Sequence, residues 1–248
     1  MDLASLSSDE ARPALVGSGA DAVVEALVAG AIVAVPSVGG YSLATRAGSP
    51  DGEARLAELA ADPDGPHYAV GQIDDVPALT SAWTDELKTL LQRCWPGPLE
   101  VFLPSARAGD GAGDGDDGGG DAPAGLHPAP DDGAPDDGAP EYGAWAVVVG
   151  MPDGRALRRL CREHGPWRTV PLRFTEPGEV VEAFRASDVA VVVDGGRREG
   201  PSPTVVDATL KPIRVLREGA LPASFIEGTM LMSTRRKLFS RHKRPPAG

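Results

Sequence analysis

Short β-branched runs alternate with helical segments along the chain, and this alternation constrains the fold more than any other feature. Residues 18–30, SGADAVVEALVAG, place their valines and Leu27 on one helical face, and Gly30 occupies the position of a helix C-cap. The run AIVAVP follows at once, and we expect a short buried strand that stops at Pro36. Repetition of this unit predicts the α/β class with a twisted, open, mixed sheet.

The remaining elements follow from the same two periodicities. We expect further strands at 66–73, 96–104, 144–152, 169–174 and 188–196, and a hairpin at 204–220. We expect further helices at 52–62, 76–95, 153–165 (with Asp153 as N-cap and Gly165 at its end) and 176–187, and a short terminal helix at 224–231.

Most of the negative charge lies in one segment. The formal net charge is −12, but residues 109–141 alone hold nine Asp and one Glu and no Lys or Arg, which leaves 26 acids against 24 bases elsewhere. This Gly/Asp/Pro-rich stretch contains too few apolar groups to offset the entropy of ordering it. We therefore predict a disordered acidic insert at 105–143, within a surface loop between two strands of one sheet.

The two ends of the chain differ in character. Residues 1–17 are interpreted as an N-terminal extension, and 231–248 as a basic tail, with six Lys or Arg between 235 and 244. Such a run can contact nucleic acid or remain a solvated tail. The two cysteines form no CxxC pair, the four histidines have no metal-ligand spacing, and no apolar run is long enough to cross a membrane. A soluble protein of the reducing cytoplasm, without a bound metal, is the simplest interpretation.

One glycine motif is interpreted as structural. Residues 16–23, VGSGADAV, have the spacing of a dinucleotide fingerprint, which needs a preceding strand and an acid at the end of the next strand. The preceding ARPALV contains a proline, and the next strand ends without an acid. We therefore expect a plain helix start.

Several motifs occur in a specific order: WPGPLEVFL at 95–103, VVDGG at 192–196, PSPTVVD at 201–207 and RVLREGA at 214–220. With VAVPSVGGYSLA at 33–44, this order resembles the YrdC-like family, the threonylcarbamoyl-AMP synthases of tRNA modification. The resemblance covers a domain at about 18–230, apart from the insert. It implies a YrdC-like sheet around a concave, electropositive cavity. It also implies a reaction of ATP, L-threonine and bicarbonate, assisted by magnesium, that gives threonylcarbamoyl-AMP and pyrophosphate.

The family's polar motifs are changed in this chain. Where the family has PTDTVYGLA, Ser37 keeps the first hydroxyl, Val38 and Gly39 replace Asp and Thr, and Tyr41 is retained. The Lys-x-Arg and Ser-x-Asn motifs are absent, and Pro203 splits the Ser-Thr pair of PSTVVD. By resemblance, the substrate- or nucleotide-binding residues are Ser37, Tyr41, Ser202, Thr204 and Arg217. No catalytic residue is assigned.

Three functions follow from this pattern. The first is a synthase with a rearranged site, whose standard reaction is weakened or lost because charge-assisted bonds to anionic substrates are missing. The second is a non-catalytic homologue that binds ATP, AMP or a partner protein. The third is a module for tRNA or double-stranded RNA that uses the cavity and the basic tail.

Overall fold

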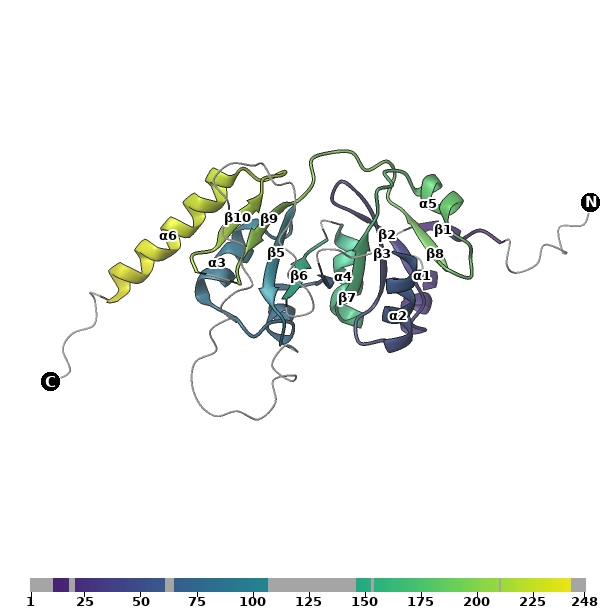
Figure 1. The fold of residues 1–248 in the computed structure, drawn as a ribbon, viewed down its shortest axis with the longest axis horizontal. Helices are drawn as coiled ribbons and strands as arrows, with labels where there is room; N and C mark the ends of the chain where they lie inside the picture. The colour runs from purple at the N-terminus through teal and green to yellow at the C-terminus, as the bar shows by residue number, and fades with distance from the viewer. Residues whose placement is uncertain are drawn as a thin grey trace, which may run out of the picture.

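The protein folds around one mixed sheet of ten strands in the order β1-β8-β2-β3-β7-β4-β6-β5-β9-β10. The computed structural model describes residues 11–17, 21–60, 65–106, 146–152, 154–209 and 211–241, with the backbone alone for 233–241. Figure 1 shows β1 and β8 with α1, α2 and α5 at one end of the molecule, and β9 and β10 with α3 and α6 at the other. The predicted α/β class and open mixed sheet are confirmed.

The strands and helices have the following bounds. The strands are β1 Ala14–Gly17, β2 Val33–Ser37, β3 Gly40–Arg46, β4 His67–Ala69, β5 Leu99–Pro104, β6 Ala146–Gly150, β7 Trp167–Pro171, β8 Val191–Asp194, β9 Thr204–Asp207 and β10 Arg214–Arg217. The helices are α1 Asp21–Val28, α2 Pro50–Leu59, the 3₁₀ helix η2 Ile73–Ala78, α3 Asp85–Cys94, α4 Arg155–His164, α5 Pro177–Ala183 and α6 Ala223–Arg241.

Helices cover the two faces of the sheet unequally. One face packs on α2 and α5 along β2, β3, β7 and β8, and on η2, α3 and α6 along β4, β5, β6 and β9. The opposite face packs on α1 and α4 mainly along β2, β3, β7 and β8, with Val16 of β1 and Ala69 of β4 at the margins. Strand register carries this second face onto His67, Val148 and Glu100, where neither α1 nor α4 joins the cluster of buried residues. This part of the sheet therefore provides the hollow described below.

The stretch VAVPSVGGYSLA is a β-hairpin, not a strand that leads into a helix. Strands β2 and β3 pair in antiparallel register around a turn at Val38 and Gly39, and Gly39 has φ 78°, a value that glycine adopts without strain. The expected stop at Pro36 is wrong because β2 continues to Ser37. Pro36 faces Tyr41, whose N–H and C=O instead bond to Phe174 and Leu172. Since β8 pairs with β2 only at Val33 and Ala34, no neighbour needs an N–H from Pro36.

Two helices differ from their predicted bounds. The expected helix at 76–95 divides into η2 and α3, because the hydroxyl of Thr84 accepts a bond from the Leu87 N–H, 3.2 Å away, and caps a helix that begins at Asp85. Thr80, which lies between η2 and α3, forms a β-bridge with Ser105. The terminal helix is longer than the expected eight residues and continues to Arg241, through much of the basic run.

The start of the chain also differs from expectation. Ala14–Gly17, placed in the predicted extension, form the edge strand β1 parallel to β8. A strand therefore does precede α1, contrary to one of the two reasons for reading 16–23 as a plain helix start. The other reason stands, since β2 ends at Ser37 without an acid.

Two sequence predictions concern residues outside the described ranges. The predicted insert at 105–143 lies outside the described residues except for Ser105 and Ala106, and the proposed N-cap Asp153 lies outside them too. Gly165 ends α4 with φ 87°, as the C-cap prediction requires. Among the described helices, none is both long and apolar enough to cross a membrane.

Candidate functional site

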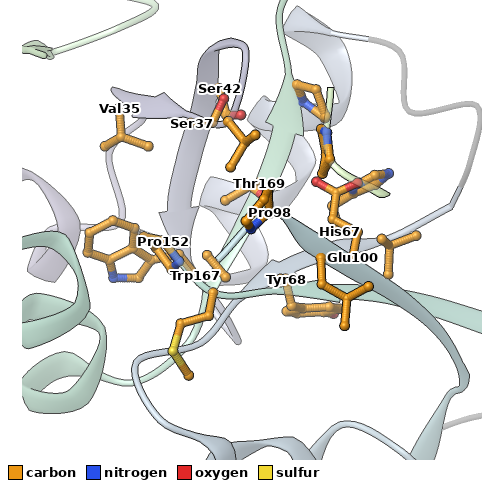
Figure 2. A pocket seen from close by; sticks show the side chains of 18 of the residues that line it. Val35, Ser37, Ser42, His67, Tyr68, Pro98, Glu100, Pro152, Trp167 and Thr169 are labelled. Carbon is orange, nitrogen blue, oxygen red and sulfur yellow. The ribbon is translucent and has the colours of Figure 1, made fainter. Parts of the chain in front are cut away.

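A hollow opens on the sheet face that α1 and α4 leave free. Strands β2 to β7 contribute side chains from this one face, and the turn before β5, residue Pro203 and the end of β6 close its rim. Figure 2 shows Val35, Ser37 and Ser42 on one side of the hollow, Trp167 and Pro152 on another, and His67 with Glu100 opposite them. The cavity has a volume of about 80 Å³. The concave cavity expected from the resemblance is therefore present.

The polar groups of the hollow are mostly neutral. Hydroxyls come from Ser37, Ser42 and Thr169, an imidazole from His67 and a carboxylate from Glu100. There is no Lys or Arg among the described lining residues, and the nearby Arg168 and Arg198 donate to the backbone carbonyl oxygens of His67 and Ser37. The loop that would carry the family's Lys-x-Arg motif, between α2 and β4, contains no base in its sequence.

The hairpin turn lies against the segment that leads into β9. A Cβ built on Gly39 would lie 3.7 Å from the Cα of Ser202, so the two stretches are in contact distance. The Nε of Arg198 donates a bond of 3.2 Å to the carbonyl oxygen of Ser37 and ties the same turn to the chain after β8. Ser37 and Pro203 line the hollow, while Ser202 itself is exposed. The predicted sites around Ser37 and Ser202 thus come together.

Tyr41 has a structural environment. Its side chain is fully buried, and its hydroxyl donates to the carbonyl oxygen of Gly196 at 2.9 Å and accepts from the N–H of Gly195 at 3.1 Å. Burial raises the pKa of this phenol above its ordinary value, so the hydroxyl stays protonated and keeps its donor. Tyr41 does not line the hollow, and its hydroxyl instead holds the Asp194–Gly196 turn against the hairpin.

Thr204 is likewise buried and bonded within the protein. Its hydroxyl donates to the carbonyl oxygen of Leu221 at 2.6 Å and accepts from the N–H groups of Gly219, at 3.0 Å, and Leu221, at 2.9 Å. A hydroxyl has one donor and two acceptor sites, so these three bonds use its full capacity. Thr204 therefore joins β9 to the segment that leads into α6.

Arg217 lies apart from the hollow. It is exposed on the edge strand β10 and does not line the cavity. Arg173, an exposed arginine in the segment after β7, does not line the cavity either. Of the five residues predicted from the resemblance, the structure places Ser37 in the cavity, Ser202 beside its rim, Tyr41 and Thr204 in the interior and Arg217 at the sheet edge.

The residues of this hollow do not fit a magnesium–triphosphate group. A triphosphate needs several cations or N–H donors around it. The described lining contains no cationic Lys or Arg side chain. No group of three or more His, Cys, Asp or Glu among the described residues could hold a metal ion. The space is also well below the several hundred Å³ typical of sites for larger ligands.

Four polar residues that line the hollow are not among those predicted from the sequence: His67, Glu100, Ser42 and Thr169. Strand register places His67 opposite Thr169, and Glu100 opposite Gly150, on one face. The period-two alternation of the predicted strands could have assigned each residue to a face, but the strand order that brings β4, β5 and β7 together could not be read from it.

Comparison with known proteins gives a consistent result. The family model Sua5_yciO_yrdC, described as "Telomere recombination", matches residues 25–112. Among solved structures, the fold is similar to P. abyssi Sua5 in complex with L-threonine (TM-score 0.64, 22% identity, 87% of this chain and 60% of that one). A Sua5 variant from the same organism gives TM-score 0.65 at 21% identity, with 86% and 62% covered. E. coli YciO gives TM-score 0.63 at 15% identity, with 86% and 97% covered.

The chain thus spans about 60% of the length of the Sua5 structures but nearly all of YciO. A search of curated protein sequences gave no match. Residues 25–112 therefore match the sequence pattern of the Sua5/YciO/YrdC family model, and the fold is similar to the Sua5 and YciO structures over 86–87% of the chain.

Proposed function

We propose that this chain is a YrdC-like protein of tRNA modification whose central hollow binds a small hydroxy-amino acid such as L-threonine. We further propose that the standard threonylcarbamoyl-AMP synthase reaction is weakened or lost. One observation carries both statements: the hollow combines hydroxyls, an imidazole and a carboxylate, and its described lining lacks Lys and Arg.

The polar groups suit an amino acid of this size. The carboxylate of Glu100 can accept bonds from an ammonium group, and the hydroxyls of Ser37, Ser42 and Thr169 can pair with a ligand hydroxyl or carboxylate. Val35, Trp167 and Pro171 supply the apolar surface that a methyl group needs. A similar fold, that of P. abyssi Sua5, is known in complex with L-threonine.

Loss of the ATP-dependent step follows from charge. Transfer of an adenylyl group needs fixed positive groups beside the phosphates, where negative charge develops. Arg217 is exposed on β10, Tyr41 and Thr204 already bond within the protein, and the α2–β4 loop has no base. These features support a protein that binds the amino acid and does not activate it.

Calorimetric titration with L-threonine tests the binding step. We expect saturable binding that weakens at least tenfold in Glu100→Gln, because one charge-assisted bond is lost. Glu25→Gln, an exposed change on α1, is the matched control and should bind like the parent protein. L-valine has the same shape without the hydroxyl and should bind more weakly. Absence of heat at millimolar threonine, or equal binding of valine, would rule out this assignment.

A further inference from the structure

A second cavity lies at the carboxyl ends of β4 and β6, outside the sheet. It has a volume of about 560 Å³ and is bounded by α3, α4 and the segment after β4. Gly71, Gln72, Ile73, Asp74, Lys88, Gln92, Trp95, Pro96, Met151, Arg158 and Arg162 line it. In open α/β sheets, the crevice beyond the carboxyl ends of parallel strands is a favoured place for ligands. Met151 is the one lining residue that this cavity shares with the central hollow.

Positive side chains reach this cavity from two helices. Arg158 and Arg162 are four residues apart on α4, and Lys88 and Gln92 are four residues apart on α3. Residues with this spacing lie one above the other on the same helix face. Each helix therefore presents a row of two polar side chains to the same space, and three of the four are cations.

Gly71 packs closely on α4 at the positions of the two arginines. A Cβ on Gly71 would lie 2.5 Å from the Arg162 backbone nitrogen and 2.7 Å from the Arg158 carbonyl oxygen, so only glycine allows this close approach to α4. The N–H of Val70 bonds to the Gly150 carbonyl oxygen at 3.0 Å and joins the two strand ends. Arg158 also donates to the carbonyl oxygen of Pro152 at 3.0 Å, which orients its guanidinium.

Cations outnumber acids among the described lining residues of this cavity. Lys88, Arg158 and Arg162 line it together with a single described acid, Asp74. Two exposed arginines elsewhere have acidic partners: Arg55 pairs with Glu58 and Asp188, and Arg197 with Glu176 and Glu199, whereas Arg93 and Arg217 are exposed and form no ion pair within the described residues. Within the described part of the chain, the side chains of Lys88 and Arg162 take part in no ion pair or hydrogen bond. Two unpaired cations beside an oriented arginine are suited to bind an anion with several oxygens.

We infer that this cavity, defined by Lys88, Arg158 and Arg162, binds the phosphate groups of a small phosphorylated molecule. Its volume lies in the range of small-molecule sites. Ile73, Trp95, Pro96 and Met151 provide an apolar wall for the uncharged part of such a ligand. The inference does not depend on the proposed function, because the central hollow and its polar side chains belong to a separate site.

Calorimetric titration of the full chain with tripolyphosphate, at 50 and 200 mM sodium chloride, tests the site. We expect binding that weakens at the higher salt and at least tenfold in the double variant Lys88→Gln/Arg162→Gln. Both residues are exposed, so the variant should keep the melting temperature of the parent. Lys88→Gln alone is the milder second variant and should show an intermediate loss.

Matched controls distinguish the cavity from general surface charge. Arg93→Gln on α3 and Arg159→Gln on α4 remove the same charges from the same helices outside the lining set, and should change the affinity less than twofold. No binding of tripolyphosphate, or equal losses in the control pair, would overturn the inference.

Further ligands identify the source of the phosphate. If ATP binds at least as tightly as tripolyphosphate and adenosine does not displace it, the ligand is a nucleotide or a similar organic phosphate that the cavity holds by its phosphate groups. A short RNA duplex that binds more tightly than either, and loses as much affinity in the double variant, would overturn the assignment to a small molecule. L-threonine titrated into the double variant should bind as in the parent, so failure of either site is recognised separately.

Discussion

The hydroxyl of Tyr41 donates to the carbonyl oxygen of Gly196 at a distance of 2.9 Å, across 155 residues of sequence. The hydroxyl oxygen of Tyr41 also accepts a bond of 3.1 Å from the Gly195 N–H. One buried side chain therefore bonds to both polar groups of the turn after β8. This pair joins the β2–β3 hairpin to the turn beside it. Tyr41, a residue of the pattern that the sequence resembles, thus supports the fold here and is not among the residues that line the hollow.

Replacing Tyr41 with Phe should destabilise the protein by about 1 kcal/mol, because the half-buried N–H of Gly195 and the carbonyl oxygen of Gly196 lose their partner. Urea denaturation followed by circular dichroism measures this difference. An unchanged midpoint would mean that water replaces the hydroxyl without cost.

Adding a methyl group to Gly195 should also weaken the contact between turn and hairpin. A Cβ there would lie 2.5 Å from the Cβ of Pro36, whose ring cannot rotate away. Gly195→Ala should therefore cost about 1–3 kcal/mol. Gly178→Ala is the matched control: its Cβ would meet nothing within 4 Å in α5, and we expect no loss or a small gain. Equal stability of the two variants would contradict the packing described.

Removing the Thr204 hydroxyl with Thr204→Val keeps the side-chain shape and deletes three internal bonds. We expect a loss of at least about 2 kcal/mol in unfolding free energy, since the Leu221 and Gly219 backbone groups are left without this partner. Thr89→Val removes one bond within α3 and should cost much less. If the two variants lost equal stability, Thr204 would not be the link between β9 and the α6 segment.

Both cysteines should be unreactive in the folded protein. Burial raises the pKa of Cys94 to about 11, and it raises the pKa of the fully buried Cys161 as well. At pH 8 the thiolate fraction of Cys94 is then roughly 100-fold below that of an ordinary thiol, and access is blocked as well. Alkylation by iodoacetamide, followed by mass spectrometry, should be slow in buffer and complete in urea. Rapid modification of the folded protein would contradict this burial.

The fold could be predicted from the sequence wherever a local pattern decides the structure. Apolar runs in the sequence predict the strands β2, β5, β6 and β8, and valines dominate in β2, β6 and β8. The hairpin was missed because Pro36 normally ends a strand, and its tolerance depends on the short pairing between β2 and β8. The predicted helix at 76–95 was too long because its apolar residues keep a helical spacing throughout. The helix α3 in fact begins at Asp85, after the N-cap at Thr84.

The candidate site was less accessible to prediction than the fold. The resemblance identified Ser37, which lines the hollow, and Tyr41 and Thr204, whose hydroxyls turn out to bond inside the protein. His67 and Glu100 come from strands that only the sheet order brings together. Likewise, Lys88 and Arg162 are ordinary helix cations in the sequence, and their convergence depends on how Gly71 packs against α4.

Pyrophosphate release from ATP in the presence of L-threonine and bicarbonate decides whether the protein catalyses the synthase reaction. A standard threonylcarbamoyl-AMP synthase, measured in parallel, confirms that the assay reports the reaction. We expect this protein to bind L-threonine and yet to release no pyrophosphate above the ATP-only background, even at high protein concentration. Release that requires both threonine and bicarbonate would show an active synthase and would refute the proposed loss of the reaction.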